Sequence, residues 1–340
     1  MLIDMHAHVI PENFPEAANR ASADRWPRMD HFEPGQARVM IAGENFRTVH
    51  SGNWDVGRRL RDMESHGVDA QAISPMPELL SYWFTPDESL EFCRYTNEFI
   101  AAMCAAAPGR FFGLGAVPLQ DPDLAAKELS SVMGMGLAGI ELGSNILGKS
   151  LGDDRFWGFF QEAERLDMPI FVHALHPTVA GRISGAQMNP IGFPTDTGLT
   201  IASIIGSGLA AKCPGLRVAF SHGGGTFPFM LPRYTHNWAG VWNEEAPIGG
   251  LGAAELERSP AEYARRFYYD TLLFDARAIR YLLEIIEPSK LLVGTDYPYM
   301  GLEEPVGKTL ASMGLSPQVL EDITWHNCFR FLNVAAPATF

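Results

Sequence analysis

Short apolar segments alternate eight times with longer amphipathic stretches along this chain of 340 residues. The apolar segments, which predict strands, cover residues 2–8, 68–74, 111–117, 137–142, 169–173, 217–222, 267–273 and 290–295. The amphipathic stretches, which predict helices, cover residues 55–66, 87–107, 122–134, 154–166, 197–211, about 227–239 and 276–286, with two or three further helices up to residue 332. Strands that alternate with helices predict a parallel sheet, and eight such units predict a closed (β/α)8 TIM barrel.

An irregular stretch at about residues 11–52 separates the first predicted strand from the first predicted helix. It contains a candidate hairpin, in which residues 37–43 return through residues 44–45 to residues 46–49. Long loops of this kind commonly cap a site. We therefore predict one barrel domain over residues 1–340, with an inserted cap or hairpin at about 11–52. The irregular stretch 240–258 predicts a second surface loop.

A doubly wound open sheet is the alternative fold. Gly223-Gly224-Gly225 follows a predicted strand, as a dinucleotide-binding turn would. However, the chain has no G-x-G-x-x-G motif and no acidic residue placed for a ribose, so the barrel is favoured.

The charge balance excludes two classes of partner. Lys and Arg number 26 and Asp and Glu number 40, which gives a net charge of −14. Because no run of Lys or Arg appears, we expect no nucleic-acid binding and no binding to an anionic membrane. A small anionic substrate needs only a few local arginines and stays compatible with this balance.

Two further features of the composition bear on the compartment. The four cysteines are scattered, which indicates reduced thiols rather than disulfides. No signal peptide fits the N-terminal segment, and the apolar runs fall short of the roughly 20 residues that span a membrane. We therefore expect a cytoplasmic enzyme.

The first predicted strand carries a His-x-His pair, His6 and His8. Side chains repeat every two residues along a strand, so both imidazoles point to the same side. Two imidazoles on one face can bind one metal ion, but the motif is short, and taken alone it favours two packed core histidines.

Other predicted strands also end in metal-binding side chains. The fifth ends at His173, the sixth at His222, and the eighth at Asp296. Catalytic groups of barrels lie at these carboxyl ends, so the metal interpretation overtakes core packing. His6, His8, His173 and Asp296 would then bind one divalent ion, most readily Zn²⁺, with Co²⁺, Mn²⁺ or Fe²⁺ as alternatives.

The ion would lower the pKa of a bound water so that hydroxide is available near neutral pH. His222 is the natural group to take or pass on a proton of that water. His176 follows the fifth strand in a loop, where it is a candidate substrate contact and the one rival to His173 as a ligand. No organic cofactor is required.

Several motifs outside these strand ends carry a family resemblance. They are Asn45-Phe46-Arg47, Trp54-Asp55, Gly67-Val68-Asp69, Val117-Pro118-Leu119-Gln120-Asp121, Gly139-Ile140, His222-Gly223-Gly224-Gly225 and Gly294-Thr295-Asp296-Tyr297-Pro298. With the strand-end ligands, they make the chain resemble the amidohydrolase superfamily, and within it the family of 2-amino-3-carboxymuconate-6-semialdehyde decarboxylase and its relatives (amidohydrolase-related family 2). The resemblance extends over nearly the whole chain.

The resemblance implies roles that the residues alone do not. It makes His6, His8, His173 and Asp296 the ligands of a single zinc ion, and it makes His222 the acid and base, with Asp296 sharing the handling of protons. It gives Arg47 a role in holding a substrate carboxylate. It also implies a homodimer, in which Arg233 reaches into the neighbouring site. No lysine ends a predicted strand, so the carbamate-bridged two-metal site of some relatives is not expected.

The chain departs from the family in the loop after the fifth strand. There it reads His173-Ala174-Leu175-His176-Pro177-Thr178, where the family has Pro and then Trp directly after the ligand. Ser221 also replaces a glycine. Since this loop would line the pocket, the departure concerns the substrate more than the reaction.

The resemblance therefore implies a metal-dependent, non-oxidative decarboxylase, a carbon-carbon lyase of aromatic catabolism that acts on a carboxylated muconate-type or (hetero)aromatic small molecule. Two alternatives stay open. The same metal site fits a hydrolase or hydratase of a lactone, cyclic amide or imide. A barrel that binds without catalysis is the second alternative, which an intact ligand set disfavours.

Overall fold

The eight predicted strands close into a parallel barrel in the computed structural model, which describes residues 1–240 and 256–335. Neighbouring strands are paired in parallel from β1 to β13, and the bridges Asp4–Val293 and Ala7–Tyr297 join the last strand to the first. The prediction of a TIM barrel is therefore confirmed. In barrel order the strands are β1 (Ile3–Val9), β5 (Ala70–Pro75), β6 (Phe111–Gly115), β7 (Gly139–Gly143), β10 (Ile170–His173), β11 (Val218–Phe220), β12 (Tyr268–Asp270) and β13 (Leu291–Leu292).

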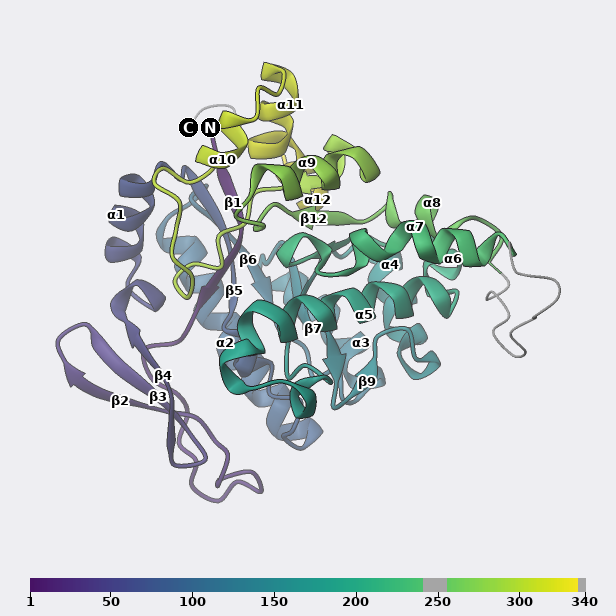
Figure 1. Ribbon diagram of the computed structural model, residues 1–340. Coiled ribbons are helices and arrows are strands. Elements are labelled where there is room, and N and C mark those ends of the chain that lie inside the picture. The colour runs from purple at the N-terminus through teal and green to yellow at the C-terminus, as the bar shows by residue number, and fades with distance from the viewer. Residues whose placement is uncertain (241–255, 336–340) are drawn as a thin grey trace.

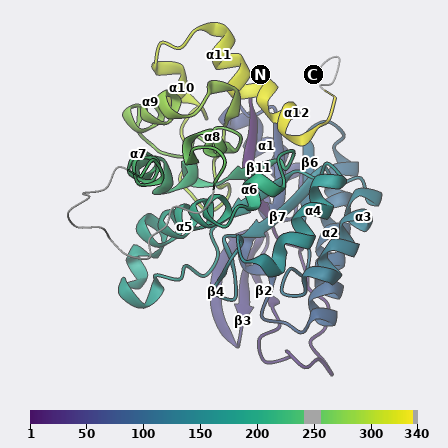
Figure 2. The same ribbon diagram turned by 90° about the vertical axis from the view of Figure 1, so that its right-hand side faces the viewer.

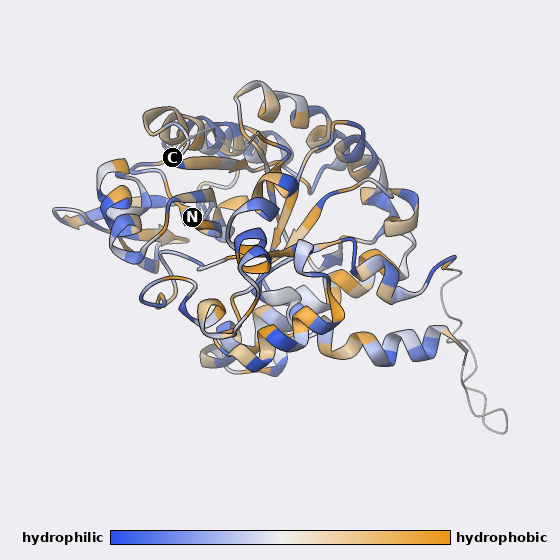
Figure 3. Cartoon of the chain, turned by 90° about the horizontal axis from the view of Figure 1, so that it is seen from above, coloured by the Kyte–Doolittle hydropathy of each residue, from blue (hydrophilic) through white to orange (hydrophobic). Residues whose placement is uncertain are grey.

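Helices surround the strands, with α2, α3 and α4 on one side and α5 and α7 on the other (Figure 2). Most of them carry both hydrophobic and hydrophilic residues, as expected of helices with one face on the barrel and one in solvent (Figure 3). The helices are α1 (Val56–His66), α2 (Pro86–Ala106), α3 (Pro122–Gly134), α4 (Trp157–Arg165), α5 (Phe193–Gly206), α6 (Leu209–Lys212), α7 (Phe227–Trp238), α8 (Pro260–Ala264), α9 (Ala276–Ile285), α10 (Lys308–Ser312), α11 (Pro317–Glu321) and α12 (Asn327–Leu332).

Two helical details differ from the sequence-based prediction. The helix expected at 197–211 begins earlier and is divided into α5 and α6, because Gly208 adopts a left-handed conformation with φ of 85°. The short helix α8 was not predicted. It is too short for a helical period to be visible, although Ser259 and Glu262 form a capping box at its start.

The last helix closes the amino end of the barrel. Apolar side chains of α12 and the turn before it, including Trp325, Phe329 and Phe331, pack against barrel residues such as Ile3 and Phe171. This cluster fills the inside of the barrel beneath the strand ends. The carboxyl ends of the strands are thus the open mouth.

The insertion after β1 forms a three-stranded antiparallel sheet of β2 (Arg28–Glu33), β3 (Gln36–Ile41) and β4 (Glu44–His50). The predicted hairpin corresponds to β3 and β4. The first strand, β2, was missed because its sequence is polar and largely exposed, so no apolar alternation marks it. The sheet projects at the end of the barrel away from the N-terminus (Figures 1 and 2), which places it beside the open mouth. A smaller two-stranded sheet joins β8 (Asn145–Ile146) and β9 (Lys149–Ser150).

Most of the predicted surface loop at 240–258 lies outside the described residues. Within residues 1–240 and 256–335, no helix is both long enough and apolar enough to cross a membrane.

Candidate metal centre

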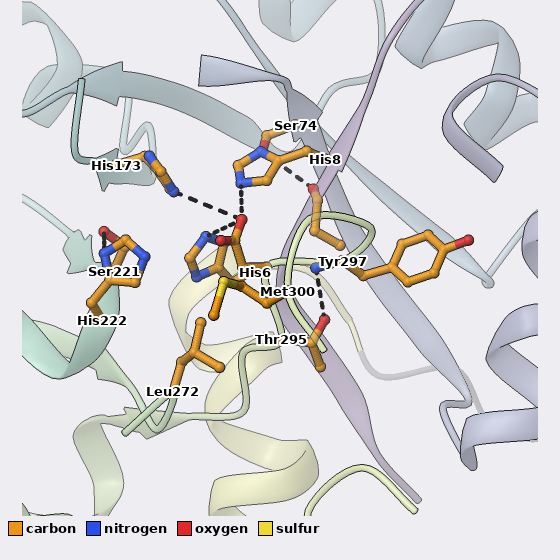
Figure 4. Close-up of polar contacts among 12 residues, drawn as sticks. His6, His8, Ser74, His173, Ser221, His222, Leu272, Thr295, Tyr297 and Met300 are labelled. Carbon is orange, nitrogen blue, oxygen red and sulfur yellow. Dashed lines mark hydrogen bonds and ion pairs between the residues drawn. The ribbon is translucent and has the colours of Figure 1, made fainter. Parts of the chain in front are cut away.

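Five side chains predicted as site residues meet at the open mouth of the barrel. His6 and His8 come from β1, His173 ends β10, His222 follows β11, and Asp296 follows β13. Figure 4 labels the four histidines among them. Among the described residues, one nitrogen or oxygen atom from each of His6, His173, His222 and Asp296 lies within 4.8 Å of the others. His8 joins them, since its Nε2 lies 3.1 Å from Asp296 Oδ1.

Three imidazoles point their Nε2 atoms at one carboxylate oxygen. Asp296 Oδ1 lies 3.6 Å from Nε2 of His6 and 4.0 Å from Nε2 of His173, in addition to its contact with His8. All three Nε2 atoms are buried and have no hydrogen-bond partner. Buried polar atoms almost always have a partner, so three orphaned atoms around one carboxylate indicate a ligand that completes them.

The opposite ring nitrogen of each histidine is held by an acceptor. Nδ1 of His6 donates to Asp270 Oδ2 at 2.7 Å, Nδ1 of His8 to the Pro75 carbonyl at 3.0 Å, and Nδ1 of His173 to the Ala174 carbonyl at 2.8 Å. A proton on Nδ1 leaves the lone pair of Nε2 free to bind a metal ion. Imidazole and carboxylate donors suit a divalent transition metal. The residues therefore form a single site for a divalent metal ion.

Backbone strain also marks this site. His222 has φ of 55° and Asp296 has φ of 58°, which is the left-handed region that side chains other than glycine rarely adopt. Such strain persists only where the surroundings impose it, and it concentrates at functional sites. Here the Asp296 amide donates to the His6 carbonyl at 2.7 Å, which ties the last strand to the first.

Asp270, at the end of β12, organises the site and was missed in the sequence. Its carboxylate accepts from Nδ1 of His6 and from the backbone amides of His222 and Gly223, at 2.7, 3.0 and 2.8 Å. Asp270 therefore orients His6 through its ring and His222 through its backbone amide. The strand-end rule does not reach it, because the predicted strand covers residues 267–273 and has Asp270 at its centre, whereas β12 ends at Asp270.

Two further buried polar residues near the site were also missed. Arg59 is fully buried and donates to the His8 carbonyl at 2.8 Å and to Gln71 Oε1 at 2.7 Å, so it fixes the β1 backbone. The Glu141 carboxyl lies 3.6 Å from Nδ1 of His8, and burial raises the pKa of Glu141 to about 8. A single sequence offers no sign that a helix arginine and a strand glutamate would turn inward.

The histidines differ in their affinity for protons. Burial lowers the pKa of His8 and His173, and it lowers the pKa of His222 to about 4. Burial also disfavours a charged His6, but the hydrogen bond to Asp270 and the charge of Asp296 outweigh it and raise the pKa of His6 to about 9. Without a metal ion, His6 is therefore the one of these four whose ring holds a second proton and is positively charged at pH 7.

Metal binding is therefore expected to release about one proton per ion at pH 7, because the ion must displace the proton of His6. Below pH 9 the metal-free protein holds this proton, so affinity should rise about tenfold per pH unit and level off above about pH 9. Calorimetric titration in buffers of different ionisation enthalpy measures the proton count. An affinity that is constant between pH 6 and 9 would contradict this assignment.

A cavity of about 420 Å³ opens beside the metal site. His173 and Asp296 line it, together with Arg47 from β4, which the insertion sheet brings to the mouth of the barrel. The guanidinium carbon of Arg47 lies 4.2 Å from the ring centre of Tyr299. His176 also lines this cavity. Arg47 and His176 therefore both lie in the pocket of their own chain.

Arg233 lies elsewhere. It belongs to α7 and lines a separate groove with residues of α5 and α7, among them Leu199 and Met230. Leu199 is 49% exposed and Met230 is 46% exposed, and the neighbouring Phe229 is 73% exposed. Arg233 is therefore placed on a partly apolar outer face rather than in the pocket of its own chain.

Comparisons with known proteins agree with this architecture. The family model described as Amidohydrolase matches residues 3–334. A 2-amino-3-carboxymuconate-6-semialdehyde decarboxylase from Dictyostelium discoideum is 32% identical over 335 residues, which cover 98% of this chain and 91% of that protein.

Two solved structures are similar as well. That of 5-carboxyvanillate decarboxylase from Sphingomonas paucimobilis aligns with a TM-score of 0.75 at 28% identity, over 83% of this chain and 84% of that one. That of dihydroxybenzoic acid decarboxylase from Polaromonas sp. JS666 contains manganese and the inhibitor 2-nitroresorcinol. It aligns with a TM-score of 0.72 at 24% identity, over 83% of this chain and 88% of that one.

Proposed function

This chain belongs to the amidohydrolase family, and we propose that it is a metal-dependent carboxy-lyase that removes CO2, without an oxidant, from a carboxylated muconate-type or (hetero)aromatic small molecule. One observation carries this proposal. Three orphaned histidine nitrogens and a carboxylate define a metal site, and the same cavity holds the guanidinium of Arg47. The relatives named above are decarboxylases, which supports the choice of reaction.

The reaction makes two demands on the protein. Breaking the bond to the carboxyl carbon leaves an electron pair on the remaining carbon, which must take up a proton as CO2 leaves. A divalent ion in this site supplies positive charge that draws electron density from the substrate. Arg47 would bind the carboxylate through its planar fork and hold the bond in a fixed orientation.

His222 is the residue that we assign to the proton. Its ring is within 5.3 Å of the His6 ring and 5.1 Å of the His173 ring, measured between centres. The His222 side chain is only half-buried, and its Nδ1 lies 3.1 Å from Ser221 Oγ. We therefore assign His6, His8, His173 and Asp296 as ligands, with His222 as the acid and base.

We further propose zinc as the bound ion, because three imidazoles and one carboxylate suit its preference for nitrogen and oxygen donors at a catalytic site with one open position. Manganese is the competing choice, since it is the ion in the similar Polaromonas structure. Elemental analysis of protein purified without added metal distinguishes the two. We keep the cytoplasm as the proposed location, on the four free cysteines.

The activity is tested by measuring CO2 released from a panel of carboxylated aromatic and muconate compounds, beside uptake of ¹⁸O from labelled water into the product. Decarboxylation predicts stoichiometric CO2 with no ¹⁸O in the product. The metal site alone also fits hydrolysis or hydration of a lactone or cyclic amide. Uptake of ¹⁸O without CO2 would overturn the proposed reaction in favour of that alternative.

We also propose a homodimer in which the α5–α7 face of each subunit meets its partner, so that Arg233 enters the neighbouring site. Support comes from the exposed apolar side chains near Arg233 and from its place in a groove separate from the pocket that Arg47 lines. A guanidinium beside Arg47 would suit a substrate with more than one carboxylate.

A shared site makes a prediction about mixed dimers. Arg233→Ala and Arg47→Ala should each lower kcat/KM by roughly 10- to 100-fold, since each removes a charge-assisted hydrogen bond to substrate. If subunits carrying either change are mixed, dimers with one intact site form and about a quarter of the wild-type turnover should return. Absence of recovery, in mixtures whose subunit exchange is confirmed by mass spectrometry, would contradict a shared site.

A further inference from the structure

The pocket has a second polar wall that the assigned reaction does not use. Nε2 of His176 lies 2.9 and 3.1 Å from the two carboxylate oxygens of Glu78, and both residues line the cavity that contains His173 and Asp296. Glu78 lies in the short helical turn Pro77–Leu80 after β5, and His176 lies in the loop after β10. Two separate barrel loops therefore bring this pair together.

The loop that carries His176 is held in place from beneath. The buried Asp196 carboxylate accepts from the amide and the hydroxyl of Thr178, both at 2.9 Å, and from Nδ2 of Asn145 at 2.9 Å. Nδ2 of Asn145 also donates to the Leu175 carbonyl at 2.8 Å. These contacts lie on both sides of His176 and impose its left-handed conformation, with φ of 43°.

The side chains of the pair are also positioned. The His176 ring stacks on Trp83, with 5.1 Å between ring centres and 27° between the planes. The Glu78 side chain is only 13% exposed, whereas that of His176 is 50% exposed. A largely buried carboxylate that faces a cavity retains lone pairs beyond the one N–H that it accepts, so it can accept a further hydrogen bond from a molecule in that cavity.

We propose that Glu78, oriented by His176, is a specificity-determining residue that accepts a hydrogen bond from an amino or hydroxyl substituent of the substrate. This inference rests on the proposed function and narrows its substrate class. The carboxylate that leaves as CO2 would be held by Arg47, which lines the same cavity as His173 and Asp296. On the side of the cavity that Glu78 lines, its carboxylate repels a second substrate carboxylate and favours a hydrogen-bond donor.

The substrate class that fits is a carboxylated ring or diene with an amino or hydroxyl group, and with that donor directed at the Glu78 wall. An analogue of the same shape that lacks the amino or hydroxyl donor would leave the Glu78 carboxylate desolvated and incompletely paired. Sites built to accept a hydrogen bond discriminate strongly against analogues that lack the donor.

The test compares matched acids. Wild-type protein and the Glu78→Ala variant are assayed for CO2 release with pairs of substituted benzoates and muconates that differ by one amino or hydroxyl group replaced by hydrogen. For at least one pair, the wild type should favour the donor-bearing acid by roughly 10- to 100-fold in kcat/KM. Glu78→Ala should remove most of that preference by raising KM for the donor-bearing acid alone.

Two further variants separate recognition from folding. Glu78→Gln keeps the shape and one acceptor oxygen, so it should restore part of the preference. Glu91→Ala removes a carboxylate that is paired with Arg20 outside the pocket and should leave the preference unchanged. A metal content equal to that of the wild type shows that each variant is folded with an intact metal site.

The outcomes separate this inference from the proposed function. If the wild type releases no CO2 from any acid, the proposed function fails. If it releases CO2 but shows no preference for donor-bearing acids, or if Glu78→Ala and Glu78→Gln both retain that preference, the role of Glu78 is overturned while the reaction stands.

Discussion

Replacing Asp296 with alanine is expected to lower metal content below about 0.2 ions per chain after dialysis and to reduce turnover at least about 1,000-fold. Asp296 provides the one anionic ligand, and its Oδ1 lies within 4.0 Å of three imidazole nitrogens. If the site binds its ion with on the order of 10 kcal/mol, the loss of one ligand of four removes roughly 2–4 kcal/mol, or about 30- to 1,000-fold in affinity. Elemental analysis and CO2 release measure the two effects.

The left-handed backbone at Asp296 calls for a second variant. Alanine at φ of 58° adds strain, whereas asparagine tolerates this conformation. Asp296→Asn also keeps an oxygen donor without its charge, so it should retain more metal than Asp296→Ala while turnover still falls. Asp123→Ala, at an exposed position on α3, is the control and should behave as the wild type. One ion per chain with normal turnover in Asp296→Ala would contradict the role of Asp296 as a ligand.

Replacing His222 is expected to lower turnover but, unlike replacing Asp296, to leave the metal content unchanged. His222→Ala should keep about one metal ion per chain and lose roughly 10²- to 10⁴-fold in kcat, which is the usual contribution of a positioned acid or base. The reason is that Nε2 of His6, His8 and His173 each lies within 4.0 Å of Asp296 Oδ1, whereas the half-buried His222 ring contacts Ser221 Oγ. Metal content and kcat measured on the same preparation make the comparison.

His8→Ala is the matched experiment for His222. Both residues lie at the same centre, so both substitutions remove one imidazole from one buried cluster. His8→Ala should lose metal and His222→Ala should retain it. If His222→Ala loses the ion and His8→Ala keeps it, the ligand set is His6, His173, His222 and Asp296 instead. Normal turnover in His222→Ala would exclude it as the acid and base.

The strand ends explain how much of the centre could be predicted. His6, His8, His173, His222 and Asp296 were recognisable because each lies at the end of an apolar segment, and parallel strands bring such ends to one rim. Asp270 escapes this rule, because the predicted segment continues to residue 273 whereas β12 ends at Asp270. Glu78 could not be predicted either, since it lies three residues past its strand in a turn that has no periodic pattern.

Arg47 and Arg233 illustrate a second limit. In the sequence both are single arginines in polar surroundings, and only the family resemblance distinguished them. The tertiary structure separates them, because β4 folds back over the barrel mouth and carries Arg47 into the cavity, whereas α7 carries Arg233 along the outer face. That separation is why a shared site between subunits is proposed for Arg233 and not for Arg47.

The barrel and the chemistry of its rim are encoded in local sequence patterns, since hydrophobic periodicity specifies strands and helices and the strand ends carry the ligands. Folding sets which ring nitrogen of each histidine is free, which residues hold the rings, and what the pocket wall presents to a substrate. These depend on contacts between residues far apart in the chain, such as His6 with Asp270 and His176 with Glu78. His6 and His8 on β1 are therefore proposed as metal ligands only because later strands and loops complete their surroundings.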